Sequence, residues 1–223
     1  MARLNLKHAR TIGSMKQHLG KVLLFCEGET EYNYFNHFAR IIEGNRIKYA
    51  HIQIEFVRAG GNAQAVLNRA NEFFEEGDNA SQYVNYEKYL VFDCDAPPNI
   101  QKVIEEALGS SHEFKLLLTN YLFELWLLMH LQRIEARPLD KREIINRFRA
   151  ELGVERYKNE QKSSEGTIRK VIGDGQNVKN AIDNAKELEE IYESKGYSVT
   201  EDISKLNPYT TVHKLVEEIL MEI

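Results

Sequence analysis

The chain has 223 residues, of which 43% are hydrophobic and 28% charged, and its formal net charge is −5 at pH 7. These values are those of an ordinary soluble globular protein with a sizeable core. The negative net charge argues against a protein that holds DNA or a membrane over its whole surface.

The charge is distributed unevenly along the chain. Residues 1–20 carry four basic and no acidic residues, and residues 131–180 carry twelve basic and eight acidic residues. An acidic core beside basic segments would suit a metal site flanked by phosphate-binding surfaces, although solvated helix faces explain the same pattern more simply. Cys26 and Cys94 are too few for a disulfide framework. We see no secretory signal and no membrane span, and we expect a cytoplasmic protein with reduced thiols.

After a basic arm over residues 1–20, predicted strands and helices alternate. Apolar or alternating runs predict strands at 21–26, 51–57, 89–92 and 114–118. Amphipathic stretches predict helices at 30–43, 63–76, 100–108 and 122–131. This order predicts an α/β fold with a parallel sheet flanked by helices, in which the strand ends gather at one edge.

The pattern becomes helical throughout after Pro138. Helices are predicted at about 139–151, 164–172, 176–195 and 208–222, and Asn207-Pro208 is interpreted as a helix start. We therefore divide the chain into a basic N-terminal arm (1–20), an α/β domain (21–135) and a helical C-terminal region (136–223). The last region packs on or beside the sheet.

Three carboxylates follow two of the predicted strands. Glu27 comes directly after the strand at 21–26 and precedes Gly28, while Asp93 and Asp95 follow the strand at 89–92. Open α/β sheets place ligand sites outside the carboxyl ends of their strands. Three carboxylates packed there repel one another, and a divalent cation would offset that repulsion. Because Mg²⁺ and Mn²⁺ prefer oxygen ligands, the three residues predict a metal site.

Asp-x-Asp after a strand is by itself a weak signal, because aspartate is common in turns and helix caps. The pairing of Asp93 and Asp95 with Glu27-Gly28, in that order and each after a strand, is what favours the metal site over the turn interpretation.

These motifs carry a family resemblance. A strand followed by Glu-Gly, and a later strand followed by Asp-x-Asp, resemble the Toprim domain of topoisomerases, bacterial primases and OLD-type nucleases. More closely, four segments together resemble the RloB family: Cys26-Glu-Gly-Glu-Thr-Glu-Tyr-Asn-Tyr-Phe35, Phe92-Asp-Cys-Asp95, Phe123-Glu-Leu-Trp-Leu-Leu-Met-His130 and Asn207-Pro-Tyr-Thr-Thr-Val212. The family commonly has a Ser-Asn-Pro turn before Phe-Glu, where this chain has Thr119-Asn-Tyr-Leu122.

The resemblance implies a Toprim-like (Rossmannoid) fold and phosphodiester hydrolysis that depends on Mg²⁺ or Mn²⁺. It implies that Glu27 is a general acid or base and that Asp93 and Asp95 form the metal-binding pair. It also implies a role in prokaryotic phage defence, in restriction-associated or abortive-infection systems, often beside an ATPase partner.

Glu124 has two interpretations that the sequence does not separate. A carboxylate in the apolar helix at 122–131 is costly to bury unless it is paired or binds an ion, so it is a candidate metal ligand or catalytic base. Alternatively, it complements the dipole at the start of the helix. His130 is expected to be a packed histidine rather than a ligand, and Trp126 a core residue.

We expect nucleic acid, DNA or RNA, as the partner. Lys158, Lys162, Arg169 and Lys170 could follow its backbone, although each alone is more simply solvated. No Gly-Lys-Ser/Thr loop is present, so no intrinsic P-loop ATPase is predicted. Two other functions stay open: a non-catalytic partner or regulatory subunit of a defence ATPase, and a small nucleotide phosphoesterase. A homo-oligomer is compatible with all of them.

Overall fold

The computed structural model describes residues 19–95, 99–155, 157 and 164–223. The basic arm expected at residues 1–20 lies almost wholly outside the described residues, as do Lys158 and Lys162. No helix of the described part is both long and apolar enough to cross a membrane.

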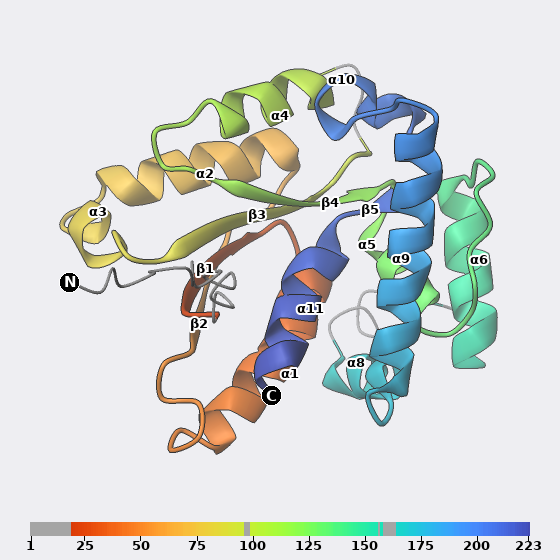
Figure 1. The fold of residues 1–223 in the computed structure, drawn as a ribbon, viewed down its shortest axis with the longest axis horizontal. Coiled ribbons are helices and arrows are strands. Elements are labelled where there is room, and N and C mark those ends of the chain that lie inside the picture. Colours follow the sequence, from red (N-terminus) through yellow and green to blue (C-terminus); the bar gives the residue numbers. More distant parts are fainter. Residues whose placement is uncertain (1–18, 96–98, 156, 158–163) are drawn as a thin grey trace, which may run out of the picture.

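The described residues form a five-stranded sheet in the order β2-β1-β3-β4-β5 (Figure 1). The strands are β1 (Lys21–Cys26), β2 (Gln53–Arg58), β3 (Glu87–Asp93), β4 (Lys115–Asn120) and β5 (Tyr209–Thr210). The first four run parallel, and β5 pairs with β4 in the antiparallel direction. The α/β sheet predicted from the sequence is therefore confirmed.

Helices cover both faces of this sheet (Figure 1). One face carries α2 (Ala63–Glu75) and α4 (Ile100–Leu108), with the short α3 (Asn79–Gln82) beside α2. The other face carries α1 (Glu29–Gly44) and α11 (Val212–Glu222).

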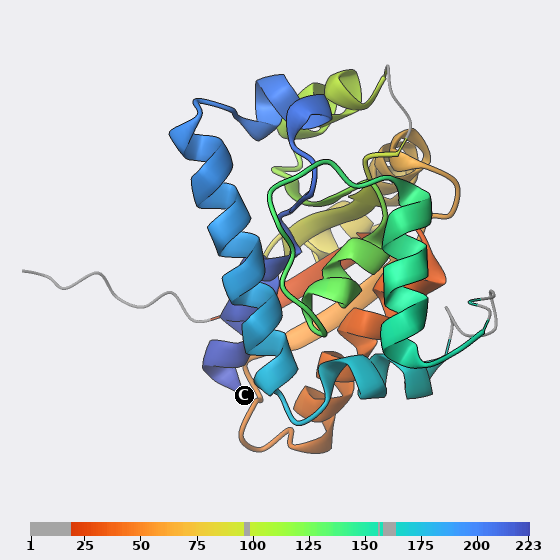
Figure 2. The same ribbon diagram turned by 90° about the vertical axis from the view of Figure 1, so that its right-hand side faces the viewer.

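A helical layer stands beside the sheet at the end where β5 lies. It consists of α5 (Phe123–Met129), α6 (Lys141–Leu152), α8 (Glu165–Ile172) and α9 (Gln176–Ser194). In Figure 2, α5 lies between α6 and α9. The chain then passes through α10 (Val199–Asp202) and a 3-10 turn, η1 (Ile203–Lys205), before it returns to the sheet.

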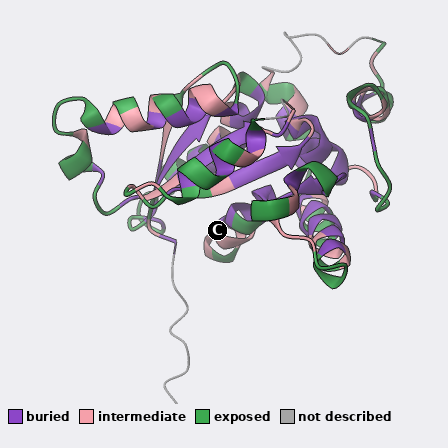
Figure 3. Ribbon diagram, turned by 90° about the horizontal axis from the view of Figure 1, so that it is seen from above, coloured by how far each residue is buried: buried purple, intermediate pink, exposed green. Residues whose placement is uncertain are grey.

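The core follows from the apolar strands, which are buried on both faces as parallel strands usually are. Along β1, residues 22–26 are all 0–1% exposed, and Trp126 in α5 is fully buried as expected. Figure 3 shows the buried residues concentrated on the strands and on the helix faces that meet them.

The prediction was wrong about the segments that form the edge of the sheet. Residues 208–211 were expected to start a helix, but Tyr209–Thr210 form β5, and α11 begins at Val212. Thr119 and Asn120 were expected in a turn and instead end β4. Side-chain pairing explains both differences, because the hydroxyls of Thr119 and Thr210 lie 3.0 Å apart in a buried hydrogen bond.

The connection between α5 and α6 is held to α9 by one buried amide. The side chain of Asn184 in α9 accepts a hydrogen bond from the backbone N–H of Ile134 (3.1 Å). It donates to the carbonyl oxygens of Met129 (2.8 Å) and Gln132 (3.2 Å). A single side chain thus satisfies one backbone group in the last residue of α5 and two in the segment that follows it.

Asn184→Ala should lower the free energy of unfolding by about 2–4 kcal/mol, because it leaves buried backbone groups without partners. Urea denaturation would measure the change. Asn180→Ala, an exposed position on the same helix, is the matched control and should change stability by less than about 0.5 kcal/mol. Equal effects of the two substitutions would contradict this role of Asn184.

Candidate metal centre

The neighbouring strands β1 and β3 bring Glu27 and Asp93 together at the carboxyl edge of the sheet. The backbone N–H of Glu27 donates to the carbonyl of Val91 at 3.1 Å, so Glu27 continues the ladder between these strands. Its side-chain Oε2 accepts a hydrogen bond from the backbone N–H of Asp93 at 3.1 Å. The pairing of two strand ends, inferred from the sequence, therefore places two of the predicted residues in direct contact.

A further carboxylate, Glu31, belongs to the same cluster and was not among the site residues predicted from the sequence. It is 5% exposed and lies in the first turn of α1, whose N-cap is Gly28. Its Oε2 lies 2.9 Å from the place that a Cβ on Gly28 would occupy. The missing side chain of Gly28 therefore makes room for this carboxylate. The Gly28-x-x-Glu31 spacing, which is that of a capping box, is the signal that would have revealed it.

Glu124 also lies in this region, at 3% exposure in the first turn of α5. Its carboxylate interacts with the hydroxyl of Tyr157, and together with burial it raises the pKa of that tyrosine. Tyr157, which the sequence did not single out, packs its ring on Phe148 of α6 at 5.2 Å between centroids. The peptide bond between Asn120 and Tyr121, shortly before Glu124, is cis.

The carboxylates repel one another strongly at this place. Burial, followed by Glu31, Glu27, Glu124 and Asp95, raises the pKa of Asp93 well above its ordinary value. The Oδ1 atom of Asp93 and the Oε2 atom of Glu31 are buried and accept no hydrogen bond from the residues that the structure describes. Buried acceptors without partners are costly in folded proteins, and such groups indicate an ion or a functional role.

The pKa of Glu27 is raised to about 7. Burial is the largest cause, and the charge of Asp95 adds to it, whereas the N–H of Asp93 and the ammonium of Lys141 oppose the shift. The pKa of Glu31 is also raised to about 7, mainly by burial, with Glu27 and Glu124 contributing.

Asp95 is held by a cation from another part of the chain. The ammonium of Lys141, the first residue of α6, lies 2.6 Å from its Oδ2 atom. Nothing in the sequence marked Lys141, because the ion pair joins residues 46 positions apart. The helical layer therefore contributes positive charge to the edge of the candidate site.

The donor set fits a hard divalent cation, since it consists of carboxylate oxygens, two of which lack hydrogen-bond partners. Within the described residues, no three His, Cys, Asp or Glu side chains are placed so that they could hold one ion together. Mg²⁺ usually takes one or two protein carboxylates and keeps several waters. Of the three residues predicted from the sequence, Asp93 and Asp95 would hold it, and Glu27, whose carboxylate accepts a hydrogen bond from the N–H of Asp93, would lie beside them.

His130 is a packed histidine, as expected. Its Nδ1 lies 2.9 Å from the carbonyl oxygen of Trp126 and its Nε2 lies 3.1 Å from the hydroxyl of Tyr34. Burial lowers its pKa to about 4, so it is neutral at physiological pH. Both ring nitrogens are occupied by these contacts with Trp126 and Tyr34, and neither contact is with a carboxylate of the cluster.

A mostly parallel α/β sheet with acidic residues at the carboxyl ends of two neighbouring strands defines a Rossmannoid protein with a candidate cation site. The sequence profile of the family described as RloB-like protein matches residues 22–219 of this chain. The protein therefore belongs to the RloB-like family. Neither a curated protein nor a solved structure matches the chain significantly.

Without divalent cations, the melting temperature should fall as the pH is raised from 5 to 8. Glu27 and Glu31 have folded-state pKa values of about 7, above their ordinary value of 4.5, so the folded state binds more protons than the unfolded state in this range. Stability is then lost as these groups ionise. Mg²⁺ should reduce the loss at pH 8, and scanning calorimetry would measure both effects.

Asp93→Asn should make the curve flatter, raise the melting temperature at pH 8 by a few degrees and abolish the effect of Mg²⁺, because it removes one buried charge while keeping the shape. Asp183→Asn, on the exposed face of α9, is the matched control and should behave like the wild type. A melting temperature independent of pH, or a Mg²⁺ effect that survives in Asp93→Asn, would contradict a cation site at Asp93.

Proposed function

We propose that this RloB-like protein is a Toprim-type, Mg²⁺-dependent nuclease that hydrolyses phosphodiester bonds. The observation that carries the proposal is the state of Asp93, a half-buried residue whose Oδ1 atom is buried without a hydrogen-bond partner in the described part of the chain, near four other carboxylates. Repulsion among these carboxylates destabilises the folded state, and a bound divalent cation would offset that repulsion. The position of the cluster, outside the carboxyl ends of parallel strands, is where open α/β sheets bind ligands.

Each residue has a role in this proposal. Asp93 and Asp95 would hold the cation, with Glu27 beside them. When bound, the cation would polarise a phosphoryl oxygen and acidify a water molecule. Glu27 would also act as the general acid or base, since the N–H of Asp93 fixes its carboxylate at the strand end and burial keeps its pKa near neutrality.

Glu31 and Glu124 would support this centre from the side of the helices. Glu31 stands in the first turn of α1 and Glu124 in the first turn of α5, and both interact with Asp93. Glu124 is a candidate further ligand or base in the same reaction. Its contact with Tyr157 would position it rather than neutralise it, because a hydroxyl stabilises a carboxylate without adding charge.

Membership of the RloB-like family supports a role in prokaryotic phage defence, in an abortive-infection or restriction-associated system with an ATPase partner. In such a system the proposed hydrolysis would act on DNA or RNA. The partner would control when the carboxylate cluster meets its substrate.

Asp93→Asn and Glu27→Gln should each lower Mg²⁺-dependent cleavage by at least about a hundredfold, because one removes a ligand and the other the acid–base group. Cleavage of labelled single-stranded DNA, duplex DNA and RNA would be followed on gels, with and without the neighbouring ATPase, and with Asp183→Asn as the control. Cleavage that Asp93→Asn retains would contradict the proposal. A stable complex with the ATPase without hydrolysis of any substrate would favour the partner-subunit function, and hydrolysis of nucleotides alone would favour the phosphoesterase.

A further inference from the structure

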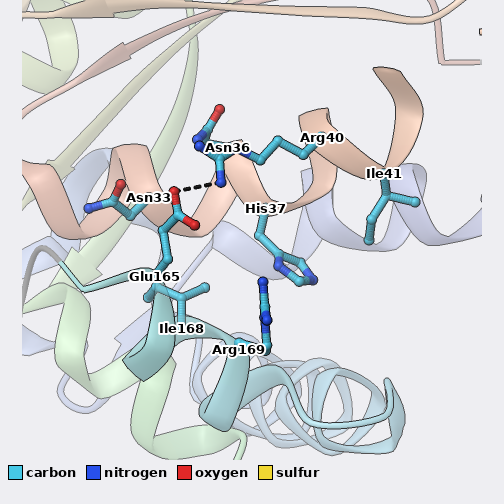
Figure 4. Close-up of a pocket in the computed structure, with 8 residues that line it drawn as sticks. All are labelled: Asn33, Asn36, His37, Arg40, Ile41, Glu165, Ile168 and Arg169. Atoms are coloured by element: carbon cyan, nitrogen blue, oxygen red, sulfur yellow. Dashed lines mark ion pairs between the residues drawn. The ribbon is translucent and has the colours of Figure 1, made fainter. Parts of the chain in front are cut away.

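A hollow lined by both polar and apolar side chains lies between α1 and α8 (Figure 4). Its volume is about 210 Å³. The polar residues that line it are Asn33, Asn36, His37, Arg40, Glu165 and Arg169. On α1 these positions recur at intervals of three and four, so they share one face of the helix.

Positive charge exceeds negative charge in this hollow. Arg40 pairs with Glu165 at 2.5 Å, which accounts for the one carboxylate in the lining. Arg169 is exposed and has no ion pair or side-chain hydrogen bond to any residue that the structure describes. In Figure 4 its guanidinium faces the imidazole of His37. Burial, Arg169 and Arg40 lower the pKa of His37, which is the effect expected of a half-buried base among unbalanced cations.

The donors in the hollow suit a phosphate group. Guanidinium groups bind phosphate oxygens in a fixed, often bidentate geometry, and side-chain amides add neutral donors. The volume is below the range of about 300–1,000 Å³ that is typical of pockets for drug-sized ligands. A single phosphate with part of its ester therefore fits this space better than a complete nucleotide does.

Helix α1 connects this hollow with the candidate metal centre. The helix carries Glu31 in its first turn and Arg40 nine residues later, a separation of about 13 Å along the axis. Phosphates of one strand of B-DNA recur about every 3.4 Å along the axis, so the separation corresponds to about four steps. Nine residues turn an α-helix by about 900°, so Arg40 lies on the side of α1 opposite to Glu31. A strand bound at the carboxylates must therefore pass around α1 to place a phosphate about four steps away in the hollow.

The neighbouring lysine of α8 is engaged elsewhere. The ammonium of Lys170 donates to the carbonyl oxygen of Leu152 at 2.6 Å. The sequence suggested that Arg169 and Lys170 of α8 could contact a nucleic-acid backbone. Of these two residues, Arg169 lines the hollow.

We propose that the hollow between α1 and α8 is a subsite for a backbone phosphate of the nucleic-acid substrate, held by Arg169 together with Arg40 and the amides of Asn33 and Asn36. The inference rests on the proposed function for the identity of the substrate. It adds a contact that positions the strand several nucleotides from the bond to be cleaved.

Binding can be separated from cleavage by working without divalent cations. Fluorescence anisotropy of labelled single-stranded DNA, duplex DNA and RNA oligonucleotides in EDTA would measure affinity at several salt concentrations. Arg169→Gln should weaken binding roughly tenfold whatever the base sequence, and it should reduce the slope of log affinity against log salt by about 1. Arg169→Lys, which keeps the charge, should restore part of the affinity.

Arg69→Gln on α2 is the control, because it removes one half-exposed arginine, paired with Glu76, from the opposite face of the sheet and should leave the affinity nearly unchanged. Asp93→Asn should bind in EDTA at least as tightly as the wild type. Equal affinity and salt slope in wild type and Arg169→Gln would overturn the subsite, and so would a wild type that binds none of the oligonucleotides. Binding that depends on Arg169, in a protein that cleaves nothing with Mg²⁺, would uphold the subsite while refuting the nuclease.

Discussion

Mutual repulsion among buried carboxylates is the constraint on which the rest of this structure depends. Asp93 ends a strand in the middle of the sheet, where its buried Oδ1 atom accepts no hydrogen bond from any residue that the structure describes. The nearby acids raise its pKa further. The neighbouring backbone holds these carboxylates in place. The N–H of Glu27 is hydrogen-bonded to the carbonyl of Val91 in the neighbouring strand. Gly28 has no side chain that would clash with the carboxylate of Glu31. Holding like charges together costs stability, and a bound cation is the simplest agent that offsets that cost.

The parts of the fold and site that local sequence pattern determines could be predicted, and those that depend on distant contacts could not. Apolar runs identified β1 and β3, and the acids at their ends identified Glu27 and Asp93, because parallel neighbours place their ends together. By contrast, β5 has two residues and no periodicity, and it exists through its pairing with β4. Lys141 meets Asp95 only after α6 has packed against the sheet domain. Glu31 was recognisable in principle, from the capping-box spacing to Gly28.

Helix α1 contributes residues both to the carboxylate cluster and to the hollow beside α8. Its first turn carries a carboxylate of the cluster, and the face that meets α8 carries His37 and Arg40. The acidic centre proposed to bind a cation and the hollow proposed to bind phosphate therefore both include residues of α1, on opposite sides of that helix. Among the twelve basic residues between positions 131 and 180, Arg169 lines this hollow. In the proposed function, the negative charge would attract the metal and the local positive charge would hold the nucleic-acid strand.

Anomalous diffraction from crystals soaked in MnCl₂, recorded at the manganese absorption edge, tests the central claim most directly. The account predicts an anomalous peak within coordination distance, about 2.1–2.3 Å, of a carboxylate oxygen of Asp93, with Glu27 or Asp95 beside it. The same soak of Asp93→Asn crystals should show no peak there. A wild-type crystal without a peak at Asp93, or with manganese bound only elsewhere, would contradict the claim that this cluster is a divalent-cation site.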